Sequence, residues 1–516
     1  MSLSEQLKGL SPSRIAAMKR GIEKESLRVG PEGTLALTAH AAKLGSPLTH
    51  PHITTDFSES QLELITGAHA GVDECLLELT RIHQFVYRAL EESEGPEMLW
   101  ACSMPCALPS DERIPLGRYG ESNIGRMKTI YRSGLSYRYG RRMQTISGIH
   151  YNFSLGGVSS EGYFALIRNF RRHSWLPLYL FGASPAVCES FVAGRSHELQ
   201  RLRPGTLYLP HATSLRMGSL GYQSDAQAAL CVSYNNLDSY AASLDHALSK
   251  PYPPYEQIGI RRDGEYRQLN TTLLQIENEF YSTIRPKRRI RPGERPLHAL
   301  RERGVEYVEV RLMDLDPFDA VGIAAPTMRF LDVFLLHCLM EASPPDHPAE
   351  IRAIAANQHK VAARGREPGL ALERGGAQVA LADWARDILA ACEPIAAALD
   401  AAQGGAAHGD ALQVAQARIE DPSTTPSARV LHAMARNHDN AYIRFGVVQS
   451  LLHAGQLRGM DLPTEALREF ETLAARSIAE QKRIEAADRL DFESYRQKYL
   501  AHDTLIIGEP RFREDR

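Results

Sequence analysis

Residues 21–29, which read GIEKESLRV, place two glutamates one residue apart. Side chains alternate between the two faces of a β-strand, so Glu23 and Glu25 would lie on the same face. Neighbouring carboxylates repel each other unless a cation or a hydrogen-bond donor lies between them. Taken alone, the pair is also typical of a solvated edge strand. A metal site becomes the stronger hypothesis only because other segments of the chain offer similar groups.

Residues 144–155, which read QTISGIHYNFSL, have the clearest alternation in the sequence. One face would be apolar, and the other would carry uncharged polar groups. A strand histidine is most often a hydrogen-bonding group without a further role. Here the histidine shares its face with side chains suited to ligand contact, so we take three of them as candidate site residues: His150, Gln144 and Asn152.

Two further segments add charged groups. The stretch HITTDFSESQLELIT contains Asp56 and Glu63, which form an acidic cluster whether it is read as a strand or as a helix. The stretch GVEYVEVRL is rich in β-branched residues and predicts a strand with Glu309 and Arg311 on one face. Each pattern also has a simpler interpretation, an acidic surface turn in the first case and a same-face ion pair in the second.

From these segments we take five carboxylates and one imidazole as candidate ligands. Such a face would be unstable without cations, because like charges repel. Oxygen ligands with a single imidazole suit Mg²⁺ or Mn²⁺ better than Zn²⁺. We therefore predict a site for these cations formed by Glu23, Glu25, Asp56, Glu63, His150 and Glu309.

Arginines close to this set imply a phosphate-rich ligand. The candidates are Arg311 and the basic run RPKRRIR at residues 285–291. Cations that clamp phosphates, with an arginine that steadies charge on the transferred group, are what phosphoryl transfer from a nucleotide requires. The sequence contains no GxxxxGK[ST] loop and no set of protein-kinase motifs. The basic run by itself is also compatible with a solvated face or an interaction surface.

These groups need a sheet that leaves one face open. At least four predicted strands have a polar face, and most of them have an apolar face opposite. We therefore predict an α+β fold with a largely antiparallel sheet, helices over its apolar side and an open, concave polar side. Helices are expected at residues 1–20, 72–95, 162–181, 226–248 and 319–342, with Asp319 as the N-cap of the last, and another strand at 271–281.

The composition shifts after residue 342. Ala-rich helical sequence then runs to about residue 501, with interruptions at 404–409 and 421–427. We interpret residues 1–342 as the catalytic core and residues 343–516 as a mainly helical region packed on it. No second ATP-binding domain is evident in that region.

The overall charge excludes some classes of protein. The 516 residues include 59 Lys and Arg against 62 Asp and Glu, a net charge of -3. This balance argues against a general nucleic-acid binder or a membrane-surface protein. No apolar run is long enough to span a bilayer, and the N-terminus lacks the character of a signal peptide. We interpret the seven cysteines as reduced thiols, most of them in the core, and expect a monomeric cytoplasmic protein.

Several motifs, in order along the chain, resemble the proteobacterial type of glutamate–cysteine ligase (γ-glutamylcysteine synthetase). They extend from about residue 15 to about residue 342, with GREPGL at 365–370 as a last, weaker match. Beyond that point only the helical character agrees. The motifs are GIEKESLRV, HITTDFSESQLELIT, SMPC, YGRRMQTISGIHYNFSL, LFGASPA, ATSLR, QIENEFYSTIRPKR and EYVEVR.

The resemblance implies a glutamine-synthetase-like core whose antiparallel sheet forms a funnel-shaped active site. It also implies ATP-dependent joining of the γ-carboxylate of L-glutamate to the amine of L-cysteine through γ-glutamyl phosphate, the first step of glutathione biosynthesis. The expected cofactor is Mg²⁺ or Mn²⁺, and ATP is a co-substrate. The expected partners are these small molecules alone.

The resemblance further assigns roles to residues. The six candidate metal ligands fall on the metal positions of the family, and Arg311 falls on the arginine that faces the transferred phosphoryl group, beside Glu309. Arg216 falls where the substrate glutamate is held. The remaining implied contacts are Lys287 and Arg132 with the nucleotide, Tyr131, Tyr222 and Tyr281 around cysteine, and Gln144 and Asn152 with substrate.

Three alternatives remain open from the sequence. A related γ-glutamyl ligase would use another amine as acceptor. A non-catalytic metal-binding or nucleotide-binding protein would keep the acidic face for stability. Nucleic-acid binding through residues 285–291 is disfavoured by the overall charge.

Overall fold

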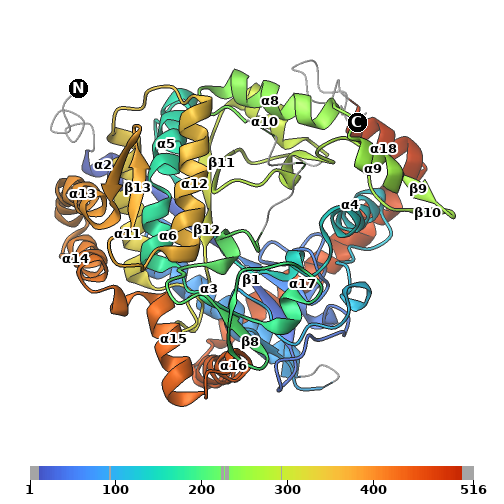
Figure 1. The fold of residues 1–516 in the computed structure, drawn as a ribbon. Helices are drawn as coiled ribbons and strands as arrows, with labels where there is room; N and C mark the ends of the chain where they lie inside the picture. The colour runs from blue at the N-terminus through green and yellow to red at the C-terminus, as the bar shows by residue number, and fades with distance from the viewer. Residues whose placement is uncertain are drawn as a thin grey trace.

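The computed structural model describes residues 11–91, 95–221, 226, 230, 232–291 and 293–501. Its main feature is a seven-stranded sheet with the order β11-β12-β5-β1-β3-β2, in which β4 also pairs with β1. Figure 1 labels β1, β11 and β12 of this sheet. All of these pairings are antiparallel, as predicted. The strands are β1 (Lys19–Val29), β2 (Ile53–Thr55), β3 (Gln61–Ile65), β4 (Met98–Leu99), β5 (Ile149–Ser154), β11 (Ile284–Lys287) and β12 (Tyr307–Met313).

Helices cover the apolar face of this sheet. The alternation in β5 buries Ile149, Tyr151 and Phe153 on that side. The Tyr151 hydroxyl donates to Asp332 Oδ1 at 2.7 Å, which links the sheet to the overlying helix. The covering helices are α3 (Val72–Glu91), α5 (Ser160–His173), α6 (Trp175–Phe181) and α11 (Ala325–Met340).

The position of Lys24 confirms the alternation in β1. It lies between Glu23 and Glu25 in sequence, but its Nζ is 2.9 Å from His83 Nε2 of α3, on the covered side. Burial lowers the pKa of Lys24 to about 7. The flanking glutamates therefore lie on the opposite, open face of the sheet.

The later part of the chain is mainly helical, as predicted, apart from a hairpin of β13 (Ala371–Arg374) and β14 (Ala377–Ala380). Buried serines connect these helices to the rest of the chain. Ser477 Oγ accepts from the Ser46 amide at 2.9 Å, and Ser450 Oγ accepts from the Ala101 amide at 3.0 Å. The helices are α12 (Pro348–Arg364), α13 (Leu381–Gln403), α14 (Ala407–Glu420), α15 (Pro426–Asn437), α16 (Tyr442–Gly459), α17 (Thr464–Ala487) and α18 (Phe492–Leu500).

The prediction of a strand at residues 271–281 is wrong. This segment is irregular and contains a short 3₁₀ turn at Glu277–Glu279. Glu279 Oε2 accepts from the Gln275 amide at 2.6 Å, and Glu277 pairs with Arg295 at 2.7 Å. Bonds from a side chain to its own neighbouring backbone replace the ladder that a strand would need.

Several predicted boundaries also shift. The helix expected from Asp319 begins only at Ala325, because residues 316–322 form a turn, so Asp319 is not its N-cap. Within the segment predicted as a helix at 226–248, helix α8 (Leu237–Ser249) begins only after Asn236, which is its N-cap. The single helix expected at 162–181 is divided at Ser174 into α5 and α6. The helical lead-in at 1–20 is reduced to α2 (Pro12–Ala16), and residues 1–10 lie outside the described residues.

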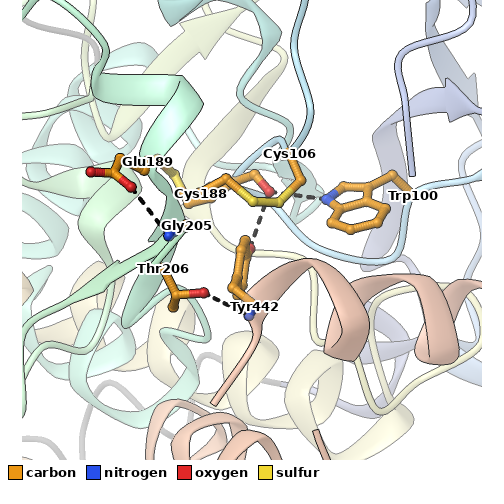
Figure 2. The surroundings of a disulfide bond; sticks show 8 residues. Trp100, Cys106, Cys188, Glu189, Gly205, Thr206 and Tyr442 are labelled. Carbon is orange, nitrogen blue, oxygen red and sulfur yellow. Dashed lines mark hydrogen bonds between the residues drawn. A yellow bond between two sulfur atoms is a disulfide. The ribbon is translucent and has the colours of Figure 1, made fainter. Parts of the chain in front are cut away.

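The cysteines are not all reduced thiols. Cys106 and Cys188 form a disulfide with their Cα atoms 5.2 Å apart, beside Trp100 and Tyr442 (Figure 2). The two residues are 82 positions apart in sequence, so no local pattern pairs them. The free cysteines among the described residues are all buried, in agreement with a core position: Cys75, Cys102, Cys338 and Cys392. Cys231 lies outside the described residues.

No helix in the described part of the chain combines the length and the apolar character needed to cross a membrane.

Candidate active site

The register of the sheet brings the predicted acidic groups together on its open face. Glu23 of β1 lies opposite His150 of β5, and Glu25 lies opposite Glu63 of β3. On the other side of β5, Glu309 of β12 lies opposite Asn152. Four strands therefore contribute side chains to one face.

His150 lies at the centre of this group. Its Nδ1 is 3.1 Å from Glu23 Oε2 and 3.8 Å from Glu309 Oε1, and its Nε2 is 3.6 Å from Glu25 Oε1. Ligand atoms of Glu23, Glu63 and His150 all lie within 4.8 Å of one another. One ion of ordinary coordination distance can contact all three groups.

Cations balance the charge on one side of the face. Lys287 Nζ is 3.0 Å from Glu309 Oε1, and Arg311 Nη1 is 3.1 Å from Glu309 Oε2. Burial opposes ionisation of Glu309, but the charges of Lys287 and Arg311 hold its pKa well below the usual value. Burial and Glu309 favour the neutral form of Glu23, but the hydrogen bond from His150 and the charge of Lys287 outweigh them and lower its pKa.

The other side of the face lacks such balance. Burial, followed by the charge of Asp56, raises the pKa of Glu25 to about 8. Burial and the carboxylates of Glu23 and Asp56 raise the pKa of Glu63 well above its usual value. Asp56, which follows β2, therefore contributes to the raised pKa of both glutamates. Carboxylates under such repulsion gain most from a bound cation.

The donor set fits a hard divalent cation. Asn152 Oδ1 and Glu309 Oε1 are buried oxygens that accept no hydrogen bond from the described residues, although Lys287 lies near the second. Burial and the charge of Arg311 lower the pKa of His150, so its imidazole is neutral at pH 7, the form that binds metal. Mg²⁺ or Mn²⁺ would be held by these oxygens and this one nitrogen, with its charge matched by the carboxylates.

Metal binding should become stronger as pH rises through the raised pKa of Glu25. Without metal, the folded protein keeps Glu25 protonated up to its raised pKa of about 8, whereas in the unfolded chain the carboxyl ionises near its ordinary pKa of 4.5. The free energy of unfolding therefore falls as pH rises across that interval. Bound metal needs the ionised form. Mg²⁺ or Mn²⁺ should therefore raise the midpoint of thermal unfolding more at about pH 9 than at about pH 6.

The control for this prediction is Glu25→Gln, which cannot ionise. Calorimetry should show a smaller difference between the two pH values in this variant. An equal metal-induced shift at both pH values in the unmodified protein would contradict the assignment of Glu25.

A cavity of about 230 Å³ adjoins the acidic face. Glu25, His150, Arg216, Arg311 and Tyr281 are among the side chains that line it. Its lining also includes residues of α12, from the later part of the chain, and several apolar side chains. The cavity therefore combines charged, polar and apolar groups.

Arg216 is held rigidly at this cavity. Its Nη2 donates to the carbonyl of Arg311 at 2.9 Å, and its Nη1 is 3.7 Å from Asp314 Oδ1. The guanidinium crosses Gly148, where an added Cβ would lie 2.1 Å from Nη2. The Gly148 amide also donates to Glu25 Oε2 at 2.8 Å. Gly148 thus connects the acidic face to the arginine of the cavity.

Gly148 and Asp314 were not among the predicted site residues. Asp314 accepts from Ser214 Oγ at 3.0 Å and from the Ala183 amide at 2.9 Å, so it is itself fixed. The glycine on the polar face of a predicted strand was a signal of close approach by another group. No sequence pattern indicated Asp314.

Other predicted residues lie away from the cavity. Tyr131, on α4 (Asn123–Tyr139), is half-buried and is not part of the cavity lining, and Gln144 is buried in a 3₁₀ turn before β5. Arg132 donates through Nε to the carbonyl of Asp56 and through Nη1 to the Lys128 carbonyl. Arg132 thus supports the chain at Asp56. Tyr222 lies outside the described residues.

Known proteins match this chain over nearly its full length. The model of the family described as Glutamate-cysteine ligase matches residues 6–361. A glutamate–cysteine ligase of Pseudomonas entomophila (strain L48) is 51% identical over 499 residues, which cover 93% of each chain. The structure of a glutamate–cysteine ligase from Francisella tularensis in complex with AMP has a TM-score of 0.88 and 38% identity, covering 94% of this chain and 97% of that chain. A bifunctional glutathione synthetase from Pasteurella multocida has a TM-score of 0.70 and 26% identity, over 92% of this chain and 58% of that chain.

An antiparallel sheet with this acidic face, beside an arginine-lined cavity, provides the groups that a ligase needs to activate a carboxylate by phosphoryl transfer. Within that class, the chain belongs to the glutamate–cysteine ligase family. The resemblance carried by the sequence motifs is thereby confirmed, together with the α+β fold.

Proposed function

We propose that the protein joins the γ-carboxylate of L-glutamate to the amine of L-cysteine and converts ATP to ADP and phosphate. The observation that carries this proposal is the meeting of Glu23, Glu63, His150 and Glu309 on one sheet face, next to a cavity lined by Arg216 and Arg311. The names of the relatives agree with it, and the Francisella tularensis structure contains AMP.

The reaction proceeds in two balanced steps. The γ-carboxylate of glutamate attacks the terminal phosphorus of ATP, the bond from that phosphorus to ADP breaks, and γ-glutamyl phosphate forms. The amine of cysteine then attacks the acyl carbon, phosphate leaves, and the nitrogen loses a proton. No protein nucleophile takes part, so the cysteines of the chain are not needed for the chemistry.

Each side chain has a distinct part in these steps. Mg²⁺ or Mn²⁺, when held by Glu23, Glu25, Asp56, Glu63, His150 and Glu309, supplies positive charge to the phosphates of ATP. Arg311 faces the transferred phosphoryl group and offsets its developing charge, and Glu309 holds Arg311 in place at 3.1 Å. Arg216 binds the substrate glutamate. The further contacts in this proposal are Lys287 and Arg132 with ATP, Tyr131, Tyr222 and Tyr281 around cysteine, and Gln144 and Asn152 with substrate.

The proposal extends to the organisation of the chain. We take residues 1–342 as the catalytic core and residues 343–516 as the helical region packed on it, although α12 also lines the cavity. We expect a cytoplasmic monomer.

A coupled assay of ADP release tests the function directly. The protein is supplied with ATP, Mg²⁺ and L-glutamate and with one amine at a time from a panel at equal concentration. We expect the largest kcat/KM with L-cysteine. A higher value with another amine would instead support a related γ-glutamyl ligase, and no release that depends on both amino acids would overturn the proposal.

Asp314→Asn should weaken the binding of glutamate without a matching effect on ATP. The carboxylate of Asp314 is buried 3.7 Å from Arg216, and loss of its charge removes a restraint on the guanidinium. A hydrogen bond or contact with a charged group contributes about 1.5–3 kcal/mol, so KM for glutamate should rise about 10- to 100-fold. Steady-state kinetics with glutamate and ATP varied in turn provide the measurement. An equal rise in both KM values would show that the change acts on the fold instead.

A further inference from the structure

Two helices on the covered side of the sheet bring a second set of metal-binding groups together. Helices α5 and α11 (Figure 1) pack against each other. The rings of Phe170 and Phe334 are 5.8 Å apart. Three residues further along each helix, the imidazoles of His173 and His337 are 6.0 Å apart. Both contacts join residues that are three positions apart on their own helix, in the same order. The two helices therefore run in the same direction, with these residues side by side.

A carboxylate completes the group. Glu341 follows directly after α11, and its Oε2 is 2.7 Å from His173 Nε2 and 3.9 Å from His337 Nε2. Ligand atoms of the three residues all lie within 4.8 Å of one another. The imidazoles are 7% and 8% exposed and the carboxylate is 37% exposed, so the group is open to solvent on the glutamate side.

Among the described residues, no Lys or Arg side chain forms an ion pair with Glu341. The nearby guanidinium of Arg172 is already held by Glu350, at 2.7 Å from Nε and 3.0 Å from Nη2, and by Asn169 Oδ1 at 2.9 Å from Nη1. A hydrogen bond to Glu341 would account for the position of the His173 imidazole. It does not account for the His337 imidazole, which lies near the same carboxylate oxygen.

We propose that His173, His337 and Glu341 bind a divalent cation of the borderline class, such as Zn²⁺, apart from the active site. Two imidazoles and one carboxylate are a ligand set that Zn²⁺ takes, with water in the fourth position. This differs from the oxygen-rich active site, which suits harder ions. His173 Nδ1 is buried with no hydrogen-bond partner among the described residues, so that ligand lacks a supporting acceptor. We therefore expect a moderate affinity, below that of structural zinc sites.

The location suggests what the ion would stabilise. Glu341 ends α11, and the chain then passes Ser343 and Pro344, whose oxygens accept from Arg168 and Arg172 of α5, before it enters α12. An ion bound between α5 and the end of α11 would therefore restrain the connection to the later helices. We expect it to raise the midpoint of thermal unfolding.

Co²⁺ is a suitable probe because tetrahedral Co²⁺ absorbs visible light. The full chain would be titrated with Co²⁺ in excess Mg²⁺, using the variant His150→Asn to remove the imidazole of the active site. We expect one equivalent of Co²⁺ with tetrahedral absorption, together with a higher midpoint of thermal unfolding. Both effects should disappear when His337→Asn or Glu341→Gln is added.

The matched control is His298→Asn. It alters the grouping of Glu294, His298 and Glu302, where both carboxylates already pair with Arg303. This change should leave the Co²⁺ signal as it was. Glu341→Gln replaces a partly exposed side chain, so it remains informative if His337→Asn fails to fold. The proposal is overturned if no tetrahedral signal forms, if the signal is absent in His150→Asn, or if it survives Glu341→Gln.

Discussion

Glu309→Gln is expected to reduce ATP turnover by about 10³-fold while the protein remains folded. The carboxylate of Glu309 is 1% exposed and lies between Lys287 at 3.0 Å and Arg311 at 3.1 Å. An amide keeps the shape of the side chain but removes the negative charge, so Arg311 loses its fixed position and the proposed metal site loses one anionic ligand. Because Lys287 and Arg311 are 28% and 17% exposed, water can partly solvate them after the change.

A control for Glu309→Gln is available at Glu306, just before β12. Glu306 makes exposed contacts with Arg288 and Arg289 and lies outside the acidic face. The same substitution there should leave turnover unchanged. Release of ADP is measured for both variants, and circular dichroism monitors folding. Turnover of Glu309→Gln within tenfold of the unmodified protein would exclude the proposed role.

Gly148→Ala is expected to cause a large loss of glutamate binding. The added methyl group would lie 2.1 Å from Nη2 and 2.5 Å from Cζ of Arg216. The guanidinium cannot move away easily, because the Arg311 carbonyl and Asp314 hold it on the other side. Overpacking of this kind costs about 1–3 kcal/mol, and a displaced Arg216 should raise KM for glutamate by about 10²-fold or more.

The control for Gly148→Ala is Gly156→Ala. Gly148 directly precedes β5, and Gly156 lies shortly after it. An added Cβ there meets only the Ala17 side chain, at an ordinary 3.6 Å. Calorimetric titration with glutamate, together with steady-state kinetics, should separate the two variants. If Gly148→Ala binds glutamate as well as Gly156→Ala does, the close approach of Arg216 does not matter for function.

Much of the active face could be predicted because alternation is a local property of a strand. Lys24 lies on the covered side and Glu23 and Glu25 on the open side, as the period of two requires. The same rule placed His150 and Asn152 together on β5, and both contact Glu23, at 3.1 Å and 2.9 Å. The rule failed at residues 271–281, where Glu277 and Glu279 form buried pairs with Arg295 and Arg138 in place of a ladder.

Which side chains each strand presents to its two faces could be read from the amino-acid sequence, because backbone geometry sets that alternation residue by residue. The sequence also carries the motifs of the ligase family. The three-dimensional fold is needed to show which strands are neighbours, and hence that Glu309 lies opposite Asn152 and that Arg216 crosses Gly148. It likewise paired Cys106 with Cys188 and placed His173 beside His337. These contacts join residues far apart in the chain, and they form through the packing of whole elements, which no local pattern encodes.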